Sequence, residues 1–187
     1  MLDYQIVNHC APTLAGIKTG NLFSIHGEKL GEVKQEVRRL NRILRGKGVI
    51  LLPLKITDTY ALIYVYRPDM LARDLLCPLA SRILKNHGYT CSCPSSCLSK
   101  LIQRLRSSTE FPHEIGLFLG YPPEDVQGFI SDPHGQSHSV HCCGGCWKVY
   151  HDPQKAQVLF QQYEKCTKLY CKRLKSGASL ETLVVAG

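Results

Sequence analysis

The chain lacks several features that would assign it to a functional class directly. Its 187 residues contain no glycine-rich nucleotide-binding loop and no complete hydrolase motif, so the sequence names no reaction. The longest apolar run, at 48–54, is well short of the roughly 18–20 residues that a membrane-spanning helix requires, which predicts no association with a membrane. The first residues, MLDYQIV, resemble no secretory signal, and we therefore expect a cytoplasmic protein.

Composition and charge narrow the class further. With 44% apolar residues, the chain is long enough to bury a core without disulfides, and we predict a single domain over residues 1–187. The formal net charge is +8, and the basic residues cluster late in three predicted helices, where the last carbonyl groups favour positive charge. An acidic partner is one interpretation of this charge. Nucleic acid is not the expected partner, because no helix-turn-helix, zinc-finger or RNA-recognition signature accompanies it.

Local patterns predict an α+β fold, with a small, mostly antiparallel sheet covered by five or six helices. Branched and aromatic residues at 48–56 and 60–66 flank a turn and indicate a hairpin, in which Pro53 requires an edge position or a bulge. Segments 21–26 and 147–150 are the expected companion strands. Apolar spacing and capping residues predict the helices: 28–45, one from Asp69 kinked at Pro78, one around 98–105, two short helices within 112–130, and a long one from Asp152 to Gly177.

Ten cysteines and eight histidines are the strongest chemical signal. Six of the cysteines lie in two clusters, 91–97 and 141–146; Cys10 lies near the start, and others lie in predicted helices. Thiols in the cytosol stay reduced, which favours metal ligands, nucleophiles or small core residues over disulfides. Short-spaced cysteines are typical of zinc sites, and iron or an iron–sulfur cluster uses the same donors. The predicted metal ligands are Cys143, Cys146, Cys142 and His141, and a redox dithiol at Cys143 and Cys146 is the alternative.

Three segments carry a resemblance to a known family. They read HCAPTLAGIKTGNLF at 9–23, FPHEIGLFLGYPPEDVQGFI at 111–130, and CWKVY at 146–150. In this order they resemble an uncharacterised bacterial family, domain of unknown function 3793, over nearly the whole chain. The resemblance implies a cytosolic protein in which these segments are shared features, while the cysteines at 91–97 lie outside the shared pattern. It implies no activity, since the family has none established.

Within these segments, the predicted catalytic residues are Cys10, His113 and Glu114. Residues 11–14 read as the start of a short helix, whose amides would stabilise a thiolate at Cys10. His113 at another helix start would be neutral and able to act as a base, whereas Glu114 in a first turn has an ordinary structural explanation. A small-molecule enzyme with a site between Cys10, Lys18 and His113 is therefore a third hypothesis, beside the metal- or thiol-dependent protein and a regulatory interaction module with a basic surface.

Overall fold

A three-stranded antiparallel sheet forms the centre of the computed structural model, which describes residues 2–90, 93–107, 110–132 and 147–187. Its strands are β1 (Gly20–His26), β2 (Ile50–Ile56) and β3 (Tyr60–Tyr66), in the order β1-β3-β2. The predicted hairpin and the companion strand at 21–26 are confirmed. Pro53 lies on an edge strand, and the β2–β3 register shifts between Pro53 and Lys55. Proline is tolerated in a strand at an edge or at a bulge, and here both conditions are met.

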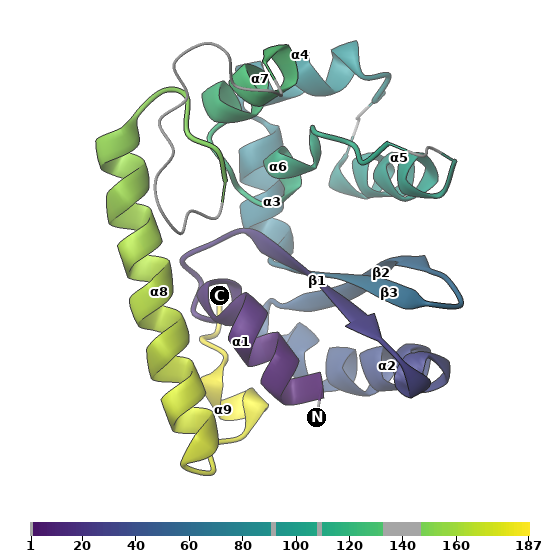
Figure 1. Ribbon diagram of the computed structural model, residues 1–187, viewed down its shortest axis with the longest axis vertical. Coiled ribbons are helices and arrows are strands. Elements are labelled where there is room, and N and C mark those ends of the chain that lie inside the picture. Colours follow the sequence, from purple (N-terminus) through teal and green to yellow (C-terminus); the bar gives the residue numbers. More distant parts are fainter. Residues whose placement is uncertain (1, 91–92, 108–109, 133–146) are drawn as a thin grey trace.

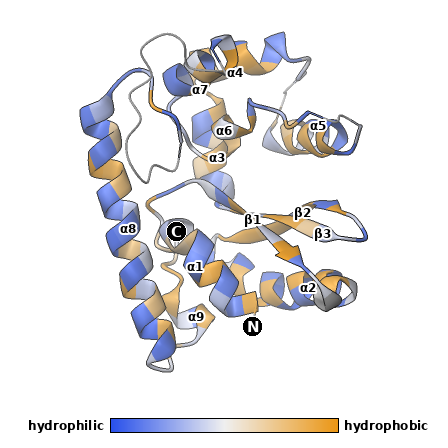
Figure 2. Cartoon of the chain, viewed as in Figure 1, coloured by the Kyte–Doolittle hydropathy of each residue, from blue (hydrophilic) through white to orange (hydrophobic). Residues whose placement is uncertain are grey.

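The central strand β3 is buried on both faces, and its alternating side chains supply two separate cores. Ala61, Ile63 and Val65 point into one core, and Leu62, Tyr64 and Tyr66 into the other. Successive side chains of a strand point to opposite faces, so a strand with helices on both sides reads as continuously apolar. Figure 2 shows this apolar sheet in the middle of the molecule.

One face of the sheet, here called the α1 side, carries the first and last parts of the chain (Figure 1). Its helices are α1 (Leu2–Leu14), α2 (Val33–Leu44) and the short α9 (Leu180–Leu183), with 3-10 turns η1 (Glu28–Glu32) and η2 (Arg45–Lys47) flanking α2. The helix expected at 28–45 is therefore present, and its first and last turns are tightened to 3-10 geometry.

The opposite face, here called the α6 side, carries the middle of the chain (Figure 1). Its helices are α3 (Pro68–Leu75), α4 (Pro78–Asn86), α5 (Pro94–Ser107), α6 (Ile115–Phe118) and α7 (Pro123–Ser131). The long α8 (Pro153–Lys175) runs along one edge of the molecule, past both sides. As predicted, Asp152 caps α8 by accepting the amide of Lys155 at 3.0 Å, and Pro153 occupies its first turn.

Two local predictions are wrong in detail. Segment 147–150 is not a strand of the sheet in the described part of the chain, since only Val149 has bridge geometry. The helix predicted to kink at Pro78 is instead two helices, and Pro78 starts the second one, α4. The predicted N-cap Asp69 lies in the first turn of α3, and Arg67 occupies the N-cap position. The α+β class is confirmed, with nine α-helices among the described residues. None of those helices is long and apolar enough to cross a membrane.

Candidate functional site

A cavity of about 410 Å³ lies on the α6 side, between α6, α7 and the segment that leads into α8. Its wall is mainly aromatic and aliphatic. The described residues that line it are Phe111, His113, Ile115, Gly116, Leu119, Tyr121, Asp125, Val126, Phe129, Trp147 and Lys148. Most of these residues belong to the segment 111–130, and Trp147 and Lys148 come from the short segment after it.

Asp125 holds segment 147–151 against α7. The carboxylate is 3% exposed, and its Oδ2 accepts the indole N–H of Trp147 at 2.8 Å. Its Oδ1 accepts the backbone amides of Tyr150 at 2.7 Å and His151 at 2.8 Å. A buried carboxylate needs such donors to offset its lost hydration. These bonds take the place of the sheet pairing expected for this segment, and they fix the indole ring in the cavity wall.

Trp147 is also held by other rings. Its ring stacks on Tyr121 with centroids 4.8 Å apart and meets Phe160 of α8 edge-on at 4.5 Å. The Lys18 ammonium lies 5.1 Å from the centroid of Tyr121, and it donates a hydrogen bond to the carbonyl oxygen of Gly20. Lys18 is 3% exposed, so this cation–π contact forms away from bulk water, where such contacts are strongest.

Two glycines allow these elements to approach closely. A Cβ on Gly116 would lie 2.8 Å from Val126 Cγ2 and 2.9 Å from Tyr121 Cδ2. A Cβ on Gly128 would lie 2.5 Å from the ring of Tyr150. All three distances are shorter than the normal contact distance between two carbon atoms. The elements α6, α7 and segment 147–151 can therefore pack in this arrangement only with glycine at these two positions.

His113 and Lys148 both line the cavity beside Phe129. The His113 ring meets Phe129 edge-on, with centroids 4.9 Å apart. The Lys148 ammonium lies 6.0 Å from the centroid of Phe129 and 5.6 Å from that of Tyr150. His113 is exposed and Lys148 half-buried. Both polar groups can therefore reach a molecule at the mouth of the cavity.

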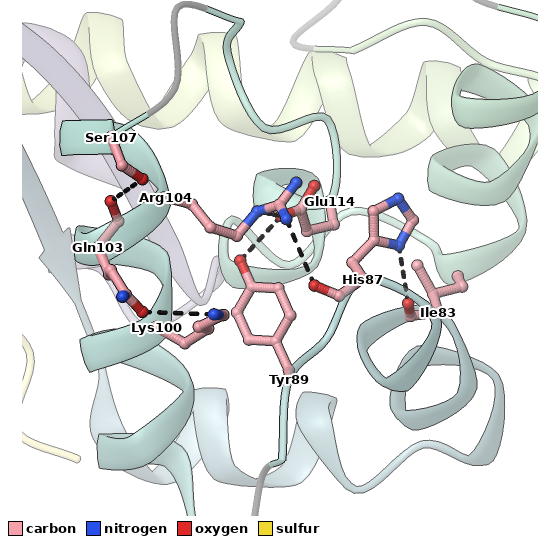
Figure 3. A network of polar contacts seen from close by, with 8 residues as sticks. All are labelled: Ile83, His87, Tyr89, Lys100, Gln103, Arg104, Ser107 and Glu114. Carbon is pink, nitrogen blue, oxygen red and sulfur yellow. Dashed lines mark hydrogen bonds and ion pairs between the residues drawn. The ribbon is translucent and has the colours of Figure 1, made fainter.

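Glu114 is not among the residues that line the cavity, and its side chain contacts Tyr89 and Arg104 in a polar network (Figure 3). Its carboxylate is 1% exposed, accepts the Tyr89 hydroxyl at 2.9 Å, and lies 2.7 Å from Arg104 Nε. The Arg104 contact is an ion pair without hydrogen-bond alignment, and its guanidinium lies 6.0 Å from the Tyr89 ring. Burial, and next the charge of Glu114, raise the pKa of Tyr89. Glu114 thus ties α6 to α5, where the sequence predicted contact with first-turn amides.

A known protein family matches nearly the whole chain. The model of a family described as "Protein of unknown function (DUF3793)" matches residues 6–184. The chain belongs to the DUF3793 family. No curated protein and no solved structure matches it.

The segments that carry the DUF3793 resemblance meet at the cavity. Lys18 comes from segment 9–23, Tyr121 and Asp125 from segment 111–130, and Trp147 from segment 146–150. Sequence reasoning named His113 and Lys18 but missed Tyr121, Asp125, Phe129, Trp147 and Lys148 as site residues. A signal was present in the sequence, because the only tryptophan of the chain and several aromatic residues lie within the segments that carry the resemblance.

The prediction of an activated thiol at Cys10 is not supported in this DUF3793 member. Residue 10 lies inside α1, which continues through Pro12 to Leu14, and not at a helix start. The thiol is fully buried in the core of the α1 side, and this burial raises its pKa far above the ordinary value, with Lys18 opposing weakly. His113 lies across the sheet on the α6 side, so the structure does not bring the two together.

The predicted metal ligands Cys142, Cys143, Cys146 and His141 lie outside the described residues. Within the described ranges, no group of three histidine, cysteine or carboxylate side chains is arranged to hold a metal ion. Cys97 of α5 is disulfide-bonded, whereas we expected reduced thiols. The zinc or iron site in this DUF3793 member therefore stays a prediction from spacing.

Proposed function

We propose that this protein binds a small, flat and largely apolar molecule in the cavity between α6, α7 and segment 147–151. The cavity volume of about 410 Å³ falls within the roughly 300–1,000 Å³ typical of small-molecule sites. The observation that carries the proposal is that large aromatic side chains of segment 111–130 meet Trp147 around one hollow in the described part of the chain. Close packing alone does not require a hollow there, which favours a binding role for its wall.

The wall suits a flat ligand because its rings are large and held in place. Tyr121, Phe129 and Trp147 offer aromatic surfaces, which prefer offset or edge-on contact with other rings. Trp147 is fixed by Asp125 and by its neighbours Tyr121 and Phe160. A site with preset side chains loses little conformational entropy when a ligand enters, which supports binding of a rigid molecule.

The chain supplies its own reporter for this proposal, because Trp147 is its single tryptophan. We expect the neutral dye N-phenyl-1-naphthylamine, which fluoresces in apolar surroundings, to bind with saturation and to accept excitation energy from Trp147. The affinity is measured by titrating the native protein while exciting the tryptophan. A linear, non-saturating signal would count against the proposal.

A pair of variants tests whether the dye sits in the cavity. Phe129→Ala removes one ring of the wall and should weaken dye binding by about tenfold, equivalent to about 1.4 kcal/mol, a magnitude expected for losing one aromatic contact. Tyr4→Ala removes a ring from α1 that is 47% exposed and lies outside the cavity wall, and it should leave the affinity unchanged. Equal affinities for both variants would place the dye elsewhere.

The metal- or thiol-dependent function is a second proposal and rests on the spacing of Cys142, Cys143, Cys146 and His141. Tight thiolate sites retain metal through purification, so protein purified without added metal should carry near-stoichiometric zinc or iron. Elemental analysis measures this directly. A content below about 0.2 equivalents would exclude a tightly bound ion of this kind.

The acidic-partner hypothesis rests on the net charge of +8. Several of the basic side chains already have intramolecular contacts: Arg39 pairs with Glu36 at 2.6 Å, and Lys168 with Glu164 at 2.6 Å. If the surface binds an acidic partner, retention on heparin should fall steeply with salt concentration. Retention that does not depend on salt would remove this hypothesis.

A further inference from the structure

We infer that the ligand of the cavity is a flat aromatic acid, whose rings enter between the apolar walls and whose anionic group stays at the mouth beside Lys148 and His113. This inference rests on the proposed function. It adds the charge and the orientation of the ligand, which the apolar wall alone does not determine.

The position of the polar groups gives the orientation. Lys148 and His113 line the cavity and both contact Phe129, and His113 is exposed while Lys148 is half-buried. Among the other described residues of the wall only Asp125 is charged, and it is buried. An anionic group placed deep in the cavity would lose its hydration without gaining a cation, whereas at the mouth it keeps water and gains Lys148.

Asp125 does not oppose an anion as strongly as its charge suggests. Its oxygens accept three hydrogen bonds, from the indole of Trp147 and from the amides of Tyr150 and His151. These donors are aimed at the carboxylate and offset its potential within the wall. Asp125 therefore acts as the anchor of segment 147–151, and it does not present a free acceptor to a cationic ligand.

A cationic ligand is disfavoured for a second reason. Ring faces that could bind a cation are already beside lysine ammonium groups of the protein, with Lys18 over Tyr121 and Lys148 over Phe129 and Tyr150. A ligand cation would have to displace these groups and would be repelled by them. A ligand with negative charge gains from the same arrangement.

Two matched dyes separate charge from shape. 8-Anilinonaphthalene-1-sulfonate has the same ring system as N-phenyl-1-naphthylamine and adds a sulfonate group. In the wild-type protein, we expect the affinity of the sulfonate dye to fall as sodium chloride is raised, and that of the neutral dye to stay constant. Energy transfer from Trp147 reports both affinities, and Phe129→Ala shows whether each dye occupies the cavity.

Variants of Lys148 then locate the charge. Lys148→Met keeps the aliphatic stem that packs on the rings and should weaken the sulfonate dye about fivefold, on the order of one partly exposed ion pair, while the neutral dye changes less than twofold. Lys148→Arg should restore sulfonate binding. Lys165→Met removes one exposed charge from α8 and serves as the matched control, with both dyes unaffected. Thermal unfolding and circular dichroism confirm that each variant is folded.

The outcomes separate the inference from the function on which it rests. If the neutral dye binds but Lys148→Met weakens both dyes equally, or neither, the ligand is not selected by charge and the inference is wrong. If neither dye binds the wild-type protein in the cavity, the proposed function itself fails, and this inference fails with it.

Discussion

The two sides of the sheet are built differently, although β3 contributes three side chains to each. The α1 side has a mainly aliphatic core, and the Cys10 thiol is fully buried within it. Arg67 closes its end by donating to the carbonyl oxygens of Thr13 and Leu14, both at 2.7 Å, at the C-terminus of α1, where a cation is favoured.

The α6 side contains buried polar groups, close contacts at glycines and a cavity. Glu114 and Asp125 are almost inaccessible, and each is held by specific donors. Such groups contribute little net stability but fix the positions of neighbouring elements. The α1 side therefore stabilises the fold mainly by close packing. The α6 side packs less closely, because its buried polar groups position the elements around a cavity.

The largest effect should come from truncating an equivalent side chain on each side. Leu40→Ala, in the close-packed core at 1% exposure, should lower the free energy of unfolding by about 3–4 kcal/mol, in the range of buried leucine truncations. Leu119→Ala should cost less, about 2 kcal/mol, because Leu119 borders the cavity and contacts fewer atoms on that flank. Urea unfolding measures both, and the opposite order would contradict the comparison.

A smaller effect is expected from the buried ion pair of the α6 side. Glu114→Gln keeps the size of the side chain but removes its charge, and should cost about 2 kcal/mol, below the usual cost for a buried pair because Arg104 is 33% exposed. Glu36→Gln removes the corresponding charge from the surface pair with Arg39 on the α1 side and should cost about 0.5 kcal/mol. Equal costs in urea unfolding would show that burial does not distinguish the pairs.

The last comparison concerns pH and the buried thiol of the α1 side. Burial raises the folded-state pKa of Cys10 above its ordinary value of 9.0, so the unfolded chain alone ionises just above that pH and stability falls as pH rises. At pH 10 this loss should reach about 1.4 kcal/mol relative to pH 8, and Cys10→Val should lack it.

Tyr64 and Tyr89, whose pKa values burial also raises, are present in both proteins, so their contribution cancels in this comparison. The measurement is urea unfolding at the two pH values with a reductant present. Identical pH dependence of wild type and Cys10→Val would mean that the Cys10 thiol is not sealed in the core.

Much of the fold could be predicted because its signals are local. Asp152 and Pro153 start α8 through contacts within one turn, and Gly120 to Pro123 separate α6 from α7 through backbone restrictions of those residues. Pro53 predicted an edge or bulge from its missing amide. The error at 147–150 has a tertiary origin, since a side chain, Asp125, satisfies the backbone groups that a sheet partner would otherwise bind.

The candidate site was predictable only in part. The segments that carry the family resemblance include most residues of the cavity wall, and His113, named from the sequence, is one of them. Cys10 was misplaced because its local sequence suggests a helix start, while apolar contacts across α1 extend the helix on both sides of it. The sequence pattern also treated Glu114 as a local cap, although Arg104 and Tyr89 bind it from other elements.

The amino-acid sequence by itself determined the class of the fold, the positions of its hairpin and long helix, and the family. The fold class and its elements depend on periodicity and capping, which act between residues a few positions apart, and the family depends on the order of residues along the chain. Only the tertiary structure decided that Lys18, Tyr121 and Trp147 are neighbours and that Cys10 lies across the sheet from His113. The reason is physical: such contacts follow from how the helices pack on each face of the sheet, and no local preference specifies that packing.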